Sequence, residues 1–217
     1  WQTYLFKSAK ILLADVIEAK IIDKKAQSIF TDAITGAQNM KNDIVNIFNN
    51  ENLVIPLGFN ELDIVREAPP LFDDIFNIMY LRQMQKLNFG YFAVFTSMSY
   101  TKKIIDMMKL GFDMANDCYG VTTNYLLENG VLARPPYVTT PKQVKFIEDK
   151  DYMSGLNMFS PKRSLNINEV AYISDALENH IFNMKLLMGF AQVVKESEIK
   201  KYFIAGKELA KKNIGIL

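Results

Sequence analysis

The chain has 217 residues, of which 49% are hydrophobic and 23% are charged, a composition that supports a packed core and a soluble surface. The 25 Lys and Arg residues nearly balance the 24 Asp and Glu residues, so the net charge of +1 gives no electrostatic case for a nucleic-acid or anionic-membrane partner. No segment approaches the roughly 18 uncharged apolar residues of a membrane span. The single cysteine, Cys118, permits no intramolecular disulfide and fits a reducing, intracellular compartment. The chain begins at Trp1 with neither an initiator Met nor a signal peptide, so we expect the natural start to lie upstream.

Four segments of the first part of the chain carry apolar residues at alternating steps of four and three, which place one stripe along a helix. The stripes predict helices around residues 5–19, 30–47, 80–98 and 105–126. Four long helices, each with such a stripe, are what an antiparallel four-helix bundle requires.

The connections between these helices predict a topology. Short turns near 23–26 and 99–102 join the first two and the last two helices into tight hairpins. Between the hairpins lies the segment 49–70, which has no helical stripe and is unusually long for a compact domain. It can carry the chain from one end of the bundle to the other, as the long crossover of ferritin-like folds does, and Pro69 and Pro70 can begin the third helix. We therefore predict an all-α, ferritin-like four-helix bundle over residues 1–133.

The proline-containing stretch 130–146 separates this bundle from the rest of the chain. Asn129 and Gly130 end the fourth helix, and the two prolines after Arg134 force an extended path. Thr140 to Gln143 fits a capping box that begins a short helix to about Asp149. Residues 134–165 are therefore predicted to be a Pro-rich linker with a short helix, and the cap at 166–169 predicts a new long helix.

This new helix repeats the first. A shift of 170 residues pairs Ile11 with Ile181, Gly36 with Gly206 and several further positions. Residues 166–217 are accordingly predicted to be the first two helices of a second, truncated bundle. Since two helices bury too little surface to be stable alone, they should pack on the first bundle, on another chain or on a missing continuation.

Three stretches resemble a known family: LVIPLGFNELDIVREAPPLFDD (53–74), NGVLARPPYVTTPKQVKFI (129–147) and LLMGFAQVVKESEIKKYFIAGKELAKKN (186–213). They are similar to a domain-of-unknown-function family of endospore-forming bacteria, some members of which are described as spore coat proteins. The resemblance implies tandem ferritin-like bundles and an association with the spore coat, and it implies no established activity. The chain differs at Asn213, where many relatives have His, which argues against a metal role for this position.

A ferritin-like fold raises the hypothesis of a di-iron or di-manganese site, which needs inward carboxylates and two Glu-x-x-His pairs. The chain has one histidine, His180, and Glu178 is two residues away, so the two point in different directions from the helix. The four apolar stripes contain no Asp or Glu. We therefore predict no such metal centre and no cofactor, although an all-carboxylate site from residues beside the stripes stays open.

Other reactive or charged residues have simpler interpretations. His180 lies on an apolar stripe and is expected to be a buried or half-buried neutral histidine with one hydrogen-bond partner. Cys118 is expected to be a buried small hydrophobic residue rather than a nucleophile. Gly36 and Gly206 are explained by close helix packing. The basic strip of the last helix is expected to be a solvated face rather than a binding strip for anions or partners: Lys200, Lys201, Lys207, Lys211 and Lys212.

The third helix is apolar on more than one face, which is typical of a helix buried on all sides. Its second face is expected to lie under the crossover and the second bundle, or alternatively in a subunit interface; the Met and Phe content also suits an apolar ligand pocket. The candidate interface residues are Phe72, Phe76, Phe89, Phe92 and Phe95.

No catalytic motif is present, so the favoured function is non-enzymatic: a structural or protein-interaction protein, with self-association or coat-type partners. The spore coat role follows from the resemblance alone. The rival hypotheses are a metal-dependent oxidoreductase or metal-binding protein of the ferritin-like fold, and a binder of an apolar small molecule.

Overall fold

The computed structural model describes residues 1–132, 134–140, 142–144, 146 and 164–217. Within these ranges the regular structure consists of six α-helices and one 3₁₀ helix, with no strand. The chain divides into two compact units, Trp1–Leu132 and Ala133–Leu217, each of which is described by itself. The predicted all-α fold is thus confirmed.

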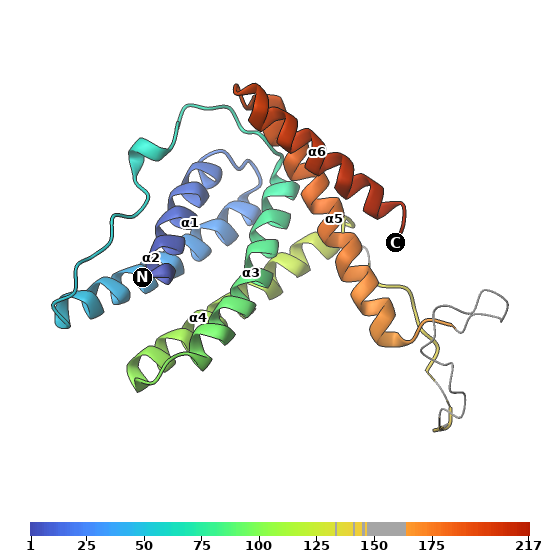
Figure 1. Ribbon diagram of the computed structural model, residues 1–217, viewed down its shortest axis with the longest axis horizontal. Helices are drawn as coiled ribbons and strands as arrows, with labels where there is room; N and C mark the ends of the chain where they lie inside the picture. Colours follow the sequence, from blue (N-terminus) through green and yellow to red (C-terminus); the bar gives the residue numbers. More distant parts are fainter. Residues whose placement is uncertain (133, 141, 145, 147–163) are drawn as a thin grey trace. The chain divides into compact units, whose positions relative to one another are not determined.

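The first unit contains four long helices joined as two hairpins (Figure 1). The first helix packs along the second and the third along the fourth, and the second helix also contacts both helices of the other hairpin. These packed pairs form the predicted four-helix bundle, whose helices are α1 (Gln2–Glu18), α2 (Lys24–Asn50), α3 (Asp74–Ser97) and α4 (Lys102–Glu128).

The start of α3 is fixed by two acidic residues. Asp73 caps the helix, since its Oδ1 accepts a hydrogen bond of 2.7 Å from the N–H of Phe76. Asp74 Oδ2 accepts hydrogen bonds from the backbone N–H groups of Ile22 and Asp23, at 3.0 and 2.8 Å, and so holds the α1–α2 turn. The expectation that Pro69 and Pro70 begin the third helix is therefore wrong, because Asp73 supplies a side-chain cap that proline lacks.

The long crossover between α2 and α3 is present (Figure 1), and side-chain contacts attach it to α1. It contains the 3₁₀ helix η1 (Glu61–Asp63). Ser8 on α1 accepts a hydrogen bond of 3.1 Å from the N–H of Phe59, and Asp15 on α1 pairs with Arg66 at 2.7 Å. These contacts fix the crossover against one side of α1.

The predicted stripes of α2 and α4 contribute part of the core of the first unit. The stripe residues Phe30, Met40 and Ile44 of α2, and Ala115 and Leu126 of α4, are buried.

Gly130 follows α4 with a φ of +66°, the left-handed conformation that ends many helices and that glycine adopts without strain.

Helices α1 and α3 bury different faces from those predicted. On α3 the second half of the predicted stripe turns outward, with Leu87 48%, Val94 53% and Met98 67% exposed. Its first half, Tyr80 and Met84, is half-buried, and polar residues lie on the buried face. On α1 the stripe residues are half-buried or exposed, whereas three other residues are buried. The buried polar or amphipathic residues of the two helices are Tyr4, Lys7 and Ser8 on α1, and Asn77, Arg82, Gln85 and Asn88 on α3.

The second unit contains the hairpin of α5 (Ile167–Val193) and α6 (Ser197–Ile214). The predicted capping box at the start of α5 is confirmed: Asn166 Oδ1 accepts from the N–H of Glu169, and Glu169 Oε2 accepts from the N–H of Asn166, both at 2.9 Å. Of the predicted short helix from Thr140 to about Asp149, residues 140, 142–144 and 146 are described and are not helical, and the others lie outside the described ranges. The assignment of this unit to a truncated second bundle stays a prediction.

Candidate functional site

A cavity of about 350 Å³ lies between the helices of the first unit and is partly open to solvent, with residues of all four helices in its wall. Most of its wall is apolar. Ile11 of α1 and Ile29 and Ile34 of α2 contribute branched side chains, and Met84 of α3 and Met114 of α4 contribute flexible thioethers. This volume is in the range of small-molecule sites, which run from roughly 300 to 1,000 Å³.

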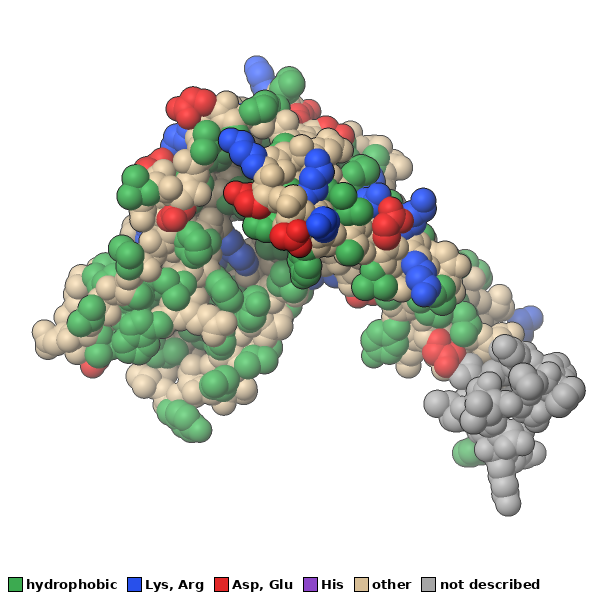
Figure 2. Space-filling model, turned by 45° about the horizontal axis from the view of Figure 1, so that its top comes forward, with side chains coloured by type: hydrophobic (Ala, Val, Ile, Leu, Met, Phe, Trp, Pro, Cys, Tyr) green, Lys and Arg blue, Asp and Glu red, His purple; other side chains and the backbone are tan. Residues whose placement is uncertain are grey.

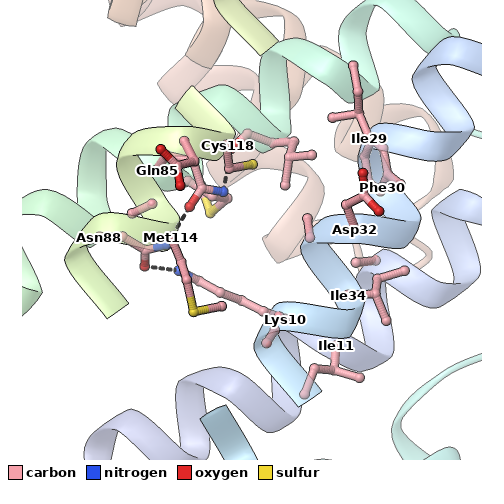
Figure 3. Close-up of a pocket in the computed structure, with 18 of the residues that line it drawn as sticks. Lys10, Ile11, Ile29, Phe30, Asp32, Ile34, Gln85, Asn88, Met114 and Cys118 are labelled. Atoms are coloured by element: carbon pink, nitrogen blue, oxygen red, sulfur yellow. Dashed lines mark hydrogen bonds between the residues drawn. The ribbon is translucent and has the colours of Figure 1, made fainter. Parts of the chain in front are cut away.

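One part of the wall is polar and is built from α1 and α3. Lys10 Nζ donates a hydrogen bond of 2.6 Å to Asn88 Oδ1, and Asn88 Nδ2 donates one of 2.8 Å to Gln85 Oε1 (Figure 3). Gln85 Nε2 in turn donates to the carbonyl oxygen of Leu81 at 3.0 Å. Every member of this row is oriented the same way, from the ammonium group to a backbone carbonyl. The row holds the Lys10 side chain extended across the cavity toward α3.

Lys7 lies one turn before Lys10 and also lines the cavity. Its side chain is buried, with the residue 8% exposed, and its Nζ lies 5.5 Å from the centre of the Phe92 ring. Burial lowers the pKa of Lys7 to about 8. Burial, and secondarily the neighbouring charge of Lys7, lowers the pKa of Lys10 to about 8. Both amines are still mostly protonated at neutral pH.

Two further titratable groups of the wall are kept neutral by burial. Cys118 is a half-buried free thiol, and burial raises its pKa to about 12. Burial also raises the pKa of the Tyr80 phenol. A thiol that stays protonated is a poor nucleophile, in agreement with the interpretation of Cys118 as a small packing residue.

The glycines show how closely the helices approach at the cavity. A Cβ on Gly36 would collide with Met114 Cε, and one on Gly111 would lie 2.5 Å from ring atoms of Phe92. In the second unit, a Cβ on Gly206 would lie 2.9 Å from Leu187 Cδ1. Close helix packing therefore explains both Gly36 and Gly206, as predicted.

The residues singled out as a candidate interface are separated by the structure. Phe76 and Phe92 are buried inside the first unit, and Phe72, Phe89 and Phe95 are half-buried. The Phe72 and Phe76 rings stack at 4.2 Å, so this part of the set contacts its own helix. The role of the five residues in an interface stays a prediction.

The candidates of the second unit lie apart from the cavity residues in the sequence. His180 is half-buried, with Nε2 3.4 Å from Asn213 Nδ2, as its stripe predicts. The lysines of α6 are exposed except for the half-buried Lys207, and Lys201 and Lys207 pair with Glu198 and Glu208 at 2.9 and 2.7 Å. This is the expected solvated face.

Metal ions and membranes are two other possible partners of the chain. Among the described residues, no group of three or more His, Cys, Asp or Glu residues is arranged to hold a metal ion. In the same part of the chain, no helix combines the length and apolar character needed to cross a bilayer.

Sequence reasoning missed the polar wall of the cavity. Lys7 and Lys10 are spaced by three residues, as are Gln85 and Asn88, and this spacing is the one signal that places each pair on a single helix face. Such pairs usually mark a solvated face, which is why the signal did not suggest an internal site.

Comparison with known proteins gives one match. No curated protein and no solved structure matches the chain. The sequence profile of the family described as "Protein of unknown function (DUF3231)" matches residues 1–144 and 153–217, nearly the whole chain. The chain therefore belongs to the DUF3231 family of proteins of unknown function.

Proposed function

We propose that the first unit is a non-enzymatic binding module that holds a small apolar molecule between its four helices. The observation that carries this proposal is the cavity of about 350 Å³ with a mainly apolar wall. The exposed Asp32 and Asp117 are among its lining residues, so the cavity reaches the surface and is accessible to a small molecule. A concave space of this size, mainly apolar with a few polar groups, is the usual form of a small-molecule site.

The chemistry of the wall favours binding over catalysis. The Cys118 thiol stays protonated because burial raises its pKa to about 12. The polar row from Lys10 to Leu81 consists of amide groups and one amine that hydrogen-bond to one another, an arrangement suited to positioning a ligand.

Native mass spectrometry of the purified full chain tests this function. We expect a bound mass of a few hundred daltons, or saturable binding of added 1-octanol as an apolar probe. Ala37 lines the cavity from α2, so Ala37→Phe should fill it and weaken binding at least tenfold. Ala93 is exposed on α3 and does not line the cavity, so Ala93→Phe is the matched control and should bind normally. Equal binding by all three proteins would contradict a site in this cavity.

A second candidate function, protein interaction, is favoured by the outward face of α3. Leu87, Tyr91, Val94 and Met98 are all exposed there, and hydrophobic side chains appear at many points of the molecular face in Figure 2. Exposed apolar patches often mark interaction surfaces. Sedimentation velocity tests self-association: Val94→Glu should dissociate an oligomer, and a monomeric wild-type protein would contradict self-association.

The remaining hypotheses are supported by fewer observations. The spore coat association depends on the family resemblance alone, whereas the ferritin-like relationship depends on that resemblance and on the long crossover between the two hairpins; both stay predictions. A metal-dependent activity also stays a prediction, and elemental analysis of the purified protein for iron and manganese tests it.

A further inference from the structure

The two lysines of the cavity are the least expected part of its wall. Lys7 and Lys10 are one turn apart on α1, and both line a space that is otherwise mainly apolar. A buried ammonium group is costly unless it is paired and hydrogen-bonded. A bundle that needed only a packed core would carry Leu or Met at these positions.

The structure leaves the positive charge of these lysines uncompensated. Lys10 has the neutral amide of Asn88 as its partner, and Lys7 has the face of the Phe92 ring. Among the residues described in the structure, neither lysine forms an ion pair with a carboxylate.

The other titratable groups of the cavity do not supply a buried counter-charge. From α4, the Cys118 thiol stays neutral because burial raises its pKa to about 12. From α3, burial raises the pKa of Tyr80 and keeps its phenol neutral. Asp32 of α2 and Asp117 of α4 also line the cavity, but both are exposed to solvent. The interior end of the cavity is therefore positive, and its carboxylates lie where water screens them.

We propose that the ligand of this cavity is an amphipathic acid, whose anionic head group is held by Lys7 and Lys10 and whose apolar body lies against the walls formed by α2 and α4. This inference rests on the proposed binding function and names the class of its ligand. Carboxylates and phosphate monoesters share the required chemistry, an oxyanion attached to an apolar body. A small anion next to two ammonium groups accepts charge-assisted hydrogen bonds from both.

The geometry of the wall supports this orientation of the ligand, with the anionic head group at the lysines and the apolar body against α2 and α4. Figure 3 shows the Lys10 side chain extended to Asn88, with Ile29 and Ile34 on the α2 side of the space. Asn88 accepts from Lys10 through Oδ1 and directs its Nδ2 to Gln85, so the amide row orients the ammonium group and leaves its other N–H bonds for a ligand.

Calorimetric titration of the full chain at pH 7 with three eight-carbon probes tests the head group. Octanoate and octyl phosphate carry an anion, whereas 1-octanol has the same apolar body and no charge. We expect at least one anion to bind at least tenfold more tightly than 1-octanol, and the tighter of the two identifies the acid. Lys7→Met and Lys10→Met should each weaken that anion at least tenfold and change 1-octanol binding less than twofold. The exposed Lys103 of α4 provides the matched control, and Lys103→Met should leave all affinities unchanged.

A pH series on the wild-type protein gives a second readout that requires no variant to fold. Since both lysines lose their protons as the pH rises through about 8, the affinity for the anion should fall between pH 7 and pH 10, while that for 1-octanol should stay constant. Equal affinities for the alcohol and the anions, with no effect of pH or of the lysine variants, would overturn the acidic head group and leave the apolar binding function standing. Failure of all three probes to bind would overturn both.

Discussion

Lys10 Nζ lies 2.6 Å from Asn88 Oδ1, which links the middle of α1 to the middle of α3 across the centre of the bundle. The hydrogen bond begins the row that continues through Gln85 to the carbonyl oxygen of Leu81. Asn88 is itself buried, so it has no ready access to water if this partner is lost. The row therefore contributes to the stability of the bundle as well as to the shape of the cavity.

Replacing Asn88 should destabilise the protein. Asn88→Ala removes the acceptor of Lys10 and the donor to Gln85, and leaving buried polar groups without partners costs about 1–3 kcal/mol. Urea denaturation measures the free energy of unfolding. Asn46 is exposed on α2, and Asn46→Ala should change that free energy by less than about 0.5 kcal/mol. Equal effects of the two substitutions would mean that the internal row of hydrogen bonds adds nothing to the free energy of unfolding.

The sequence predicted the helices of the first unit more accurately than their orientations. The stripes of α2 and α4 are mostly buried or half-buried as expected, with Phe112 as the exposed exception, because each of these helices has one clearly apolar face. On α3 apolar residues surround the helix, so the pattern could not tell the core face from the outer one. The buried face is the one that includes Arg82, Gln85 and Asn88. Hydrophobic periodicity cannot detect a polar face that is buried because its groups hydrogen-bond to one another and to the neighbouring helices.

The candidate site could not be predicted from the sequence for the same reason. Lys7 and Lys10 have the spacing of a solvated helix face, and only their packing against α3 and α4 makes them internal. Their partners are distant in the sequence, as Asn88 is from Lys10, and no local pattern joins them. The site could be recognised only once the helices were assembled.

If the lysines serve a ligand, they should lower the stability of the unliganded protein. Lys7→Met keeps the length and apolar stem of the side chain and removes the buried charge, so we expect it to raise the free energy of unfolding by about 1–3 kcal/mol. Urea denaturation of ligand-free protein at pH 7 measures this. Destabilisation by Lys7→Met would show that the ammonium group is compensated in the unliganded state.

The stabilising effect of Lys7→Met should also depend on pH. The pKa of Lys7 is lowered from 10.5 in the unfolded chain to about 8 in the folded protein, so between these values the unfolded state binds more protons. The cost of burying the charge is therefore complete below pH 8 and disappears as the pH rises toward 10.5. The advantage of Lys7→Met over the wild-type protein should shrink over this interval. A constant difference from pH 7 to pH 10 would contradict a lowered lysine pKa.

The interval from pH 7 to pH 9 separates this effect from that of Cys118. Burial raises the thiol pKa from 9.0 to about 12, so above pH 9 the folded state retains a proton that the unfolded state loses, and the stability of both proteins falls. The charge of Lys7 lowers the thiol pKa, so Lys7→Met also changes this contribution, and the comparison is free of it only below pH 9, where the thiol is mostly protonated in both states.

Two glycines of α4 should respond to alanine in opposite directions. A Cβ on Gly111 would lie 2.5 Å from atoms of the Phe92 ring and 2.9 Å from Met40 Cε, so Gly111→Ala should destabilise the protein by about 1–3 kcal/mol through overpacking. Gly120 has no such neighbour within 4 Å, and Gly120→Ala should stabilise the helix by about 0.5–1 kcal/mol. Thermal denaturation of both variants measures the contrast. A stabilising Gly111→Ala would show that α3 and α4 approach less closely than described.

The central claim, that the cavity of the first unit binds an amphipathic acid, is tested most directly by NMR of methionine methyl groups labelled with ¹³C. Met84 and Met114 line the cavity, whereas Met98 is 67% exposed on the outer face of α3. Titration with octanoate or octyl phosphate at pH 7 should shift the Met84 and Met114 methyl resonances saturably and leave Met98 in place. Unchanged Met84 and Met114 resonances, or equal shifts at Met98, would contradict the claim.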